Sequence, residues 1–79
     1  MIATGQLFED GTHLVGTEVQ PGTYAIEGKI ANCYWARMDA RGEIIDNNFI
    51  TGAGRVEVTI RSGDHSFNSE GCGEWRKVR

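Results

Sequence analysis

Apolar and polar residues alternate with a period of two along several short stretches of this chain. The clearest case is residues 55–61, where Val56, Val58 and Ile60 are separated by charged or polar side chains. Because successive side chains of a strand point to opposite faces, this pattern predicts a strand with one face in the core and the other in solvent. We therefore expect these three residues to form part of the interior.

Residues 32–38 form a second extended stretch, which is largely apolar on both faces. Alternation divides six of its residues into two sets: Cys33, Trp35 and Arg37 on one side, and Tyr34, Ala36 and Met38 on the other. If the cysteine side faces the core, the opposite side either packs under a loop or meets another molecule. We expect this second set to be the interaction surface for a protein partner.

Turn signals separate the remaining apolar runs. Eleven glycines and one proline interrupt the chain, and no run keeps a helical spacing for long enough to predict a helix. Asp10-Gly11 predicts a type I′ hairpin between residues 6–9 and 12–15, Pro21-Gly22 predicts a type II turn, and Asn47-Asn48 predicts a bend. Residues 65–68 and 74–78 are the last two predicted strands. Together these features predict one all-β domain over residues 1–79, a small antiparallel sandwich or partly closed barrel of about six to eight short strands.

The large side chains of the predicted strands supply the expected core. This core comprises Tyr24, Trp35, Val56, Val58, Ile60, Phe67 and Trp75. The two tryptophans have an alternative role, because exposed aromatic rings often contact sugars or proteins. A tryptophan near a disulfide commonly fills the interior of a sandwich, which favours the core assignment.

Cys33 and Cys72 are the two cysteines of the chain. A domain of this size buries only about 60% of the surface that its unfolded chain exposes, so a covalent bond would add substantially to its stability. In an oxidising compartment the pair predicts one disulfide, whose long loop is worth roughly 4 kcal/mol. The alternative is two reduced, buried thiols that act as small apolar side chains.

Charge and hydropathy argue against two classes of partner. The formal net charge is −3, and the eight basic side chains are scattered, so no basic stripe is available for nucleic acid. No stretch is long and apolar enough to predict a membrane span, and residues 1–6 lack the pattern of a signal peptide. We therefore expect synthesis in the cytoplasm and no membrane partner.

Candidate catalytic and metal-binding residues are few. His13, His65 and the two cysteines lack the closely spaced pairs of structural zinc sites, so no metal is expected. Asp64-His65-Ser66 contains the residue types of a hydrolase triad, but neighbouring strand residues point apart and cannot converge. The remaining acidic residues are expected to be solvated, and no phosphate-binding glycine loop is present. The sequence predicts neither an enzyme nor a cofactor.

An ordered set of short motifs resembles a small domain found in actinobacterial secreted proteins and lipoproteins, and in phages of those bacteria. The motifs are Asp10-Gly11-Thr12, Val15-Gly16-Thr17, Pro21-Gly22-Thr23-Tyr24, Cys33-Tyr34-Trp35-Ala36-Arg37, Val58-Thr59-Ile60 and Gly71-Cys72-Gly73-Glu74-Trp75. The resemblance covers roughly residues 10–76 and implies a compact β domain with paired cysteines and no established activity. Exported members usually follow a signal sequence, and an aromatic residue is common at the position of His13.

The expected function is a non-enzymatic structural or interaction module. Because the chain resembles a domain shared with phages and lacks an export signal, we expect an accessory virion protein, a capsid decoration or tail component of an actinobacterial phage. Its partners would be virion subunits or further copies of itself, and its location the virion. The alternative is a surface-acting module that binds a cell-wall carbohydrate or a surface protein. In that case Tyr34, Trp35 or Trp75 would stack on a sugar ring.

Overall fold

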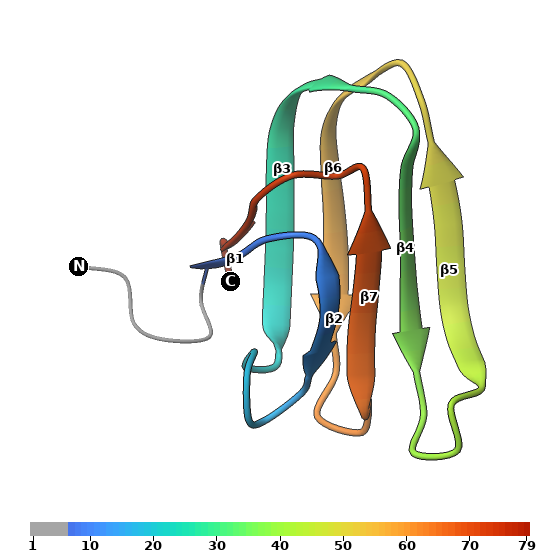
Figure 1. The fold of residues 1–79 in the computed structure, drawn as a ribbon. Helices are drawn as coiled ribbons and strands as arrows, with labels where there is room; N and C mark the ends of the chain where they lie inside the picture. Colours follow the sequence, from blue (N-terminus) through green and yellow to red (C-terminus); the bar gives the residue numbers. More distant parts are fainter. Residues whose placement is uncertain (1–6) are drawn as a thin grey trace.

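The computed structural model describes residues 7–79, which form eight β-strands and two sheets (Figure 1). The strands are β1 (Leu7–Phe8), β2 (Gly11–Leu14), β3 (Gly22–Ile30), β4 (Cys33–Met38), β5 (Ile44–Ile50), β6 (Ala53–Ile60), β7 (Ser66–Glu70) and β8 (Trp75–Lys77). The first sheet has the order β1-β8-β3-β6 and the second β2-β7-β4-β5, with every pair antiparallel. The predicted all-β sandwich with one disulfide is confirmed.

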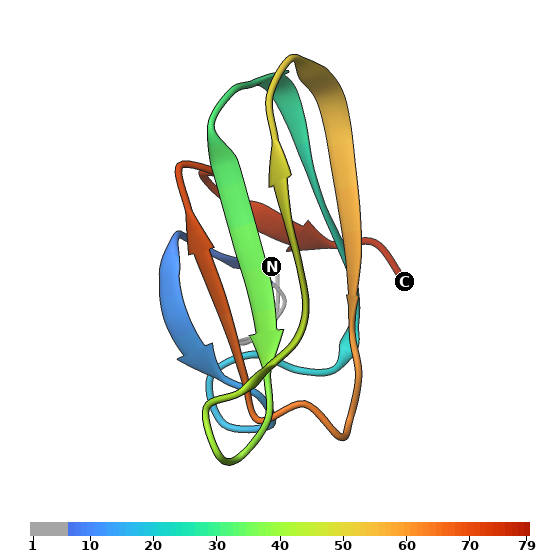
Figure 2. The ribbon, with the colours of Figure 1, turned by 90° about the vertical axis from the view of Figure 1, so that its right-hand side faces the viewer.

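The two sheets form the two layers of the sandwich, as the views of Figures 1 and 2 show. Inward side chains of both layers pack into one core, with Trp75, Tyr24 and Phe67 fully buried between them. All seven residues expected in the core lie there, and each has at most 9% of its surface exposed. Phe67 contacts the rings of both tryptophans, with centroid distances of 6.1 Å to Trp35 and 5.5 Å to Trp75.

The predicted hairpin around Asp10-Gly11 is wrong. The strands on either side of this turn belong to different sheets, because β1 pairs with β8 and β2 pairs with β7. The rings of Phe8 and His13 meet at 5.0 Å, but they belong to strands of opposite sheets. The turn therefore carries the chain from one sheet to the other. Gln6, which the predicted hairpin included, lies outside the described residues.

The Asp10 carboxylate holds the segment that precedes β8. Its Oδ1 accepts hydrogen bonds from Ser69 Oγ (2.9 Å) and the Cys72 N–H (3.1 Å), and its Oδ2 accepts one from the Gly73 N–H (3.0 Å). Trp75 Nε1–H donates to Ser69 Oγ at 3.0 Å, which links the core to this cluster. Cys72 is also bonded to Cys33 of β4. One carboxylate and one disulfide thus fix the chain between β7 and β8.

Two local turn predictions also differ from the structure. Asn47 and Asn48 lie inside β5 rather than at a bend, and their backbone is extended because it pairs with β4. Gly22 begins β3 with a φ of 154°, whereas a type II turn requires about +80° at this position. The Pro21-Gly22 pair therefore leads directly into a strand.

Candidate functional site

Apolar side chains are exposed on the outer face of the second sheet, over β4 and β5. Tyr34 pairs with Phe49 and Met38 with Ile44, so the four side chains share the face opposite to the core residues Cys33 and Trp35. Phe49 is 59% exposed and Ile44 is 53% exposed, while Tyr34 and Met38 are half-buried. We call these four residues the β4–β5 face.

The surroundings of the β4–β5 face are largely neutral. Asn47 Nδ2–H donates to the Tyr34 hydroxyl oxygen at 3.0 Å, and Thr12 Oγ1–H donates to Asn68 Oδ1 at 2.9 Å. Alternation along the paired strands places Ser66, Asn68 and Glu70 of β7 on the same side, together with Leu14, which is 42% exposed. This surface is suited to contact an apolar surface of another molecule.

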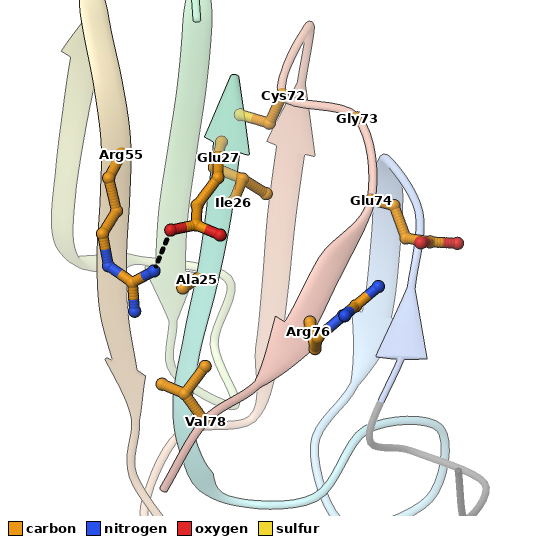
Figure 3. A pocket seen from close by; sticks show the side chains of 9 residues that line it. All are labelled: Ala25, Ile26, Glu27, Arg55, Cys72, Gly73, Glu74, Arg76 and Val78. Atoms are coloured by element: carbon orange, nitrogen blue, oxygen red, sulfur yellow. Dashed lines mark hydrogen bonds and ion pairs between the residues drawn. The ribbon is translucent and has the colours of Figure 1, made fainter. Parts of the chain in front are cut away.

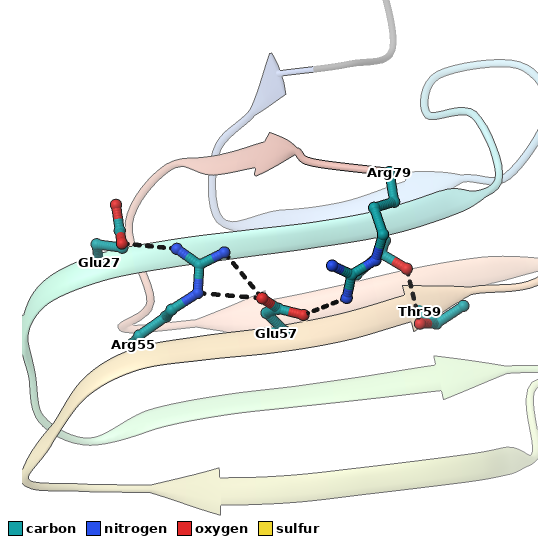
Figure 4. A network of polar contacts seen from close by, with 6 residues as sticks. Glu27, Arg55, Glu57, Thr59 and Arg79 are labelled. Atoms are coloured by element: carbon teal, nitrogen blue, oxygen red, sulfur yellow. Dashed lines mark hydrogen bonds and ion pairs between the residues drawn. The ribbon is translucent and has the colours of Figure 1, made fainter.

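The outer face of the first sheet has the opposite character. Arg55 contacts Glu27 at 2.6 Å and Glu57 at 2.8 Å, and Glu57 also pairs with Arg79 at 2.7 Å (Figure 4). The two arginines lower the pKa of the Glu57 carboxyl, chiefly through its hydrogen bond from Arg55. The sandwich therefore presents one charged face and one largely apolar face.

The free edge of β5 is shielded by its own side chains. The Asn47 N–H donates to Asp46 Oδ1 and the Phe49 N–H donates to Asn48 Oδ1, each at 2.9 Å. Unpaired edge N–H groups attract strands of other molecules, so these local bonds reduce the tendency of the edge to extend the sheet. The face of this strand is therefore better suited than its edge to contact another molecule.

Arg37 lies on the core side of β4 and is paired there with Asp64. Its Nε and Nη2 donate to the two Asp64 carboxylate oxygens at 2.7 and 2.9 Å, and the Arg61 N–H donates to the same carboxylate at 2.9 Å. Burial acts to raise the pKa of Asp64, but these hydrogen bonds outweigh it and hold the pKa below its usual value. The pair fixes the β6–β7 turn against β4.

Most of the side chains predicted to form the interaction surface are accessible, with one exception. Tyr34 and Met38 reach the surface, whereas Ala36 between them is only 2% exposed and offers a partner almost no area. Sequence reasoning missed Phe49 and Ile44. Antiparallel pairing counted outward from residues 39–43 pairs Met38 with Ile44, which could have identified Ile44. The same count pairs Tyr34 with residue 48, because the register shift between Arg37 and Met38 that brings Phe49 beside Tyr34 leaves no signal in the sequence.

The residues considered for catalysis and metal binding do not gather in the described part of the chain. Cys33 and Cys72 form the disulfide, so neither thiol is available as a ligand. Within residues 7–79 no cluster of three or more His, Cys, Asp or Glu side chains has a geometry that could hold a metal ion. No helix among these residues is long and apolar enough to span a membrane.

Comparison with known proteins identifies relatives of the chain. The family model described as "Rv1352-like extracellular domain" matches residues 5–76. Similar proteins include Rv1352 from Mycobacterium tuberculosis H37Rv and Mb1387 from Mycobacterium bovis AF2122/97, both titled uncharacterized. Each is 30% identical over 93 residues, an alignment that covers 95% of this chain and 74% of the relative. No solved structure matches the chain.

These comparisons correct the expected location. The matching family is described as extracellular, which conflicts with a virion protein made without a signal peptide. The actinobacterial part of the resemblance agrees with the mycobacterial relatives, whereas nothing among them is a phage protein. The expectation of a virion location is wrong. It depended on the resemblance to a domain shared with phages and on the absence of a signal-peptide pattern in residues 1–6.

Proposed function

Because the chain belongs to the family of Rv1352-like extracellular domains, we propose that it is a non-enzymatic extracellular module that binds a protein partner through the β4–β5 face. The observation that carries the proposal is the exposure of Phe49 and Ile44 beside Tyr34 and Met38 on one sheet face. Aromatic residues and methionine are enriched at protein interfaces, where they contribute large contact areas.

The size of the face sets the kind of complex to expect. The seven residues of β5 span about 23 Å, and four strands span about 19 Å across, so the whole outer face covers roughly 440 Å². Stable complexes bury about 800 Å² per partner. Binding confined to this face therefore belongs to the small, transient class of interfaces.

Two of the described carboxylates are unsuited to general acid–base catalysis at neutral pH. Asp64 and Glu57 have pKa values below the usual range, and each is bonded to an arginine that keeps it ionised. A general acid or base at neutral pH needs a carboxyl whose pKa is raised toward 7. The pKa values of both carboxylates are shifted in the opposite direction, away from 7.

Two of the three aromatic residues considered for stacking on a carbohydrate are buried in the structure. Trp35 is 7% exposed and Trp75 is fully buried, so neither ring can stack on a sugar. Tyr34 remains accessible, and Phe49 lies next to it. However, the aliphatic side chains of Ile44 and Met38 beside them are better suited to a protein surface.

Binding to mycobacterial cell envelopes tests the proposal. We expect fluorescently labelled protein to bind intact envelopes, and the Ile44→Thr, Phe49→Ser variant to lose at least about tenfold in affinity, because it removes exposed apolar area. Leu7→Ser is the matched control, since Leu7 is 37% exposed and belongs to β1 of the other sheet.

Treatment of the envelopes distinguishes the partner classes. Protease digestion of the envelopes should abolish binding, whereas glycan hydrolases should leave it intact. Binding that survives protease but is lost after glycan hydrolysis would support the carbohydrate alternative and contradict a protein partner. Equal binding by the wild type and the face variant would show that the β4–β5 face is not the site.

A further inference from the structure

A notch interrupts the first sheet between β3 and β8, on the opposite side of the sandwich from the β4–β5 face. β8 pairs with β3 only at Tyr24↔Lys77 and Ala25↔Arg76, while its other edge pairs with β1. β3 continues to Ile30, paired with β6 alone. The gap holds a cavity of about 440 Å³, within the range of ligand sites.

The far wall of the notch is held in place independently of any ligand. Cys72 is bonded to Cys33 of the second sheet, and the N–H groups of Cys72 and Gly73 donate to Asp10. These bonds draw the chain before β8 away from β3, so the notch cannot close by continued pairing. Figure 3 shows Cys72 at one end of the opening and Arg76 along the β8 side.

The backbone of β3 presents a hydrogen-bonding position in the notch. Thr23 exchanges backbone hydrogen bonds with the chain after β8, since its N–H donates to the Arg79 carbonyl and its carbonyl accepts from the Val78 N–H. Alternate residues of a strand direct these groups to the same side, so the N–H and carbonyl of Glu27 also point toward the notch. The β8 ladder ends before Glu27.

The charged side chains on the two walls of the notch differ in whether they form ion pairs. Glu27 is joined to Arg55 across one wall by the 2.6 Å ion pair. On the other wall, Glu74 and Arg76 are exposed, and neither forms an ion pair within residues 7–79. They lie two residues apart, and residues at this spacing share a face of a strand. One unpaired carboxylate and one unpaired guanidinium thus line the opening.

We propose that the notch binds a short extended peptide segment that carries an acidic and a basic side chain two residues apart. The peptide backbone bonds to Glu27, as in strand addition at an open sheet edge. The acidic side chain of the peptide pairs with Arg76 and the basic one with Glu74, the two charges beside the opening that have no ion-pair partner within residues 7–79. The residue between them faces Ile26 and Cys72 and is small and apolar.

Peptide titrations followed by amide NMR test this site. The probe is acetyl-Thr-Asp-Val-Lys-Thr-amide, compared with Asp/Asp and Lys/Lys versions of the same peptide. We expect the mixed-charge peptide to shift the amide signals of Glu27, Gly28 and Arg76 and to bind about fivefold more tightly than either like-charged peptide. Arg76→Glu should transfer this preference to the Lys/Lys peptide.

Arg41→Glu is the matched control, because Arg41 carries the same charge on a remote loop and its side chain is 81% exposed. This control should keep the preference of the wild type for the mixed-charge peptide. Absence of signal shifts at Glu27 and Gly28 with all three peptides at millimolar concentration would overturn the proposal. An unchanged peptide preference in a folded Arg76→Glu protein, verified by its NMR spectrum, would overturn it as well.

Discussion

The ion pair between Arg37 and Asp64 offers a sharp test of how this small sandwich is stabilised. Only 11% of the Arg37 side chain and 2% of the Asp64 side chain are exposed. Asp64→Ala would leave the guanidinium without its main acceptor, and breaking a buried pair in this way costs about 3–5 kcal/mol. Because Asp46 remains 3.9 Å from Arg37 Nη1 and is itself solvated, we expect a cost near the lower end, about 3 kcal/mol.

Such a loss would be large for this chain. Net stabilities of about 0.05–0.15 kcal/mol per residue predict roughly 4–12 kcal/mol for 79 residues. The melting temperature should fall by about 12–24 °C, since each kcal/mol corresponds to about 4–8 °C in a domain of this size. Urea unfolding monitored by fluorescence measures the effect directly, because Trp35 and Trp75 are buried and report on the core.

Two further variants separate the ion pair from general effects of mutation. Arg37→Met combined with Asp64→Leu removes both charges, and we expect it to restore most of the stability. Glu43→Ala breaks the exposed pair with Arg41 and should cost less than about 1 kcal/mol. A loss below 1 kcal/mol for Asp64→Ala, or a double variant as unstable as the single one, would refute the reasoning.

The pH dependence of stability gives an independent check on Asp64. Its pKa is lowered in the folded state, so the stabilisation is fully present above the unfolded pKa of about 3.9 and is lost as pH falls through the folded value. The stability difference between wild type and Asp64→Asn should therefore stay constant from pH 5 to 7 and shrink below about pH 4. A difference that persists undiminished at pH 2 would contradict this sign.

Three further predictions concern the rest of the fold. Replacing Cys33 and Cys72 by alanine should cost about 4 kcal/mol in urea unfolding, because their sequence separation is 39 residues; a melt unaffected by the change would contradict this. Asp10→Ala should cost about 2 kcal/mol because three donors lose their acceptor, whereas Asp10→Asn, which retains an acceptor oxygen, should cost less in the same assay. Gly22→Ala should lower stability by about 1–3 kcal/mol, since a Cβ there would lie 2.7 Å from the Arg79 carbonyl oxygen; an unchanged melting temperature would show that the C-terminus adjusts.

The alternation of side chains predicted part of this architecture well. The period of two over residues 55–61 identified β6, and the same rule placed Arg37 on the side of Cys33 and Trp35. An inward arginine requires a carboxylate partner, but the chain has eleven acidic residues and alternation cannot select Asp64 among them. That choice depends on the β6–β7 turn, which connects the two sheets and brings Asp64 beside β4.

The order of the strands in the two sheets could not be predicted from the sequence, for a related reason. Asp10-Gly11 is typical of a local hairpin. However, the Asp10 carboxylate accepts hydrogen bonds from the N–H groups of Cys72 and Gly73, which lie more than sixty residues away in the sequence. Asn47 and Asn48 have the composition of a bend, yet the side chain of Asn48 satisfies a backbone N–H at the edge of β5. Asp10 therefore bonds to residues distant in the sequence, and Asn48 bonds locally but within a strand whose pairing with β4 the local pattern does not contain.

The pairing of β1 with β8 and of β2 with β7 determines when this chain can fold. The two strands nearest the N-terminus find their partners only near the C-terminus, so the second sheet is incomplete until residue 70 is available and the first until residue 77. Such distant pairings give a high contact order, which slows folding because long loops must close first. A chain passing lengthwise through a narrow export channel would consequently remain extended until almost all of it had emerged. In an exported chain, late closure would postpone the final shape until after passage, which agrees with the description of the family as extracellular.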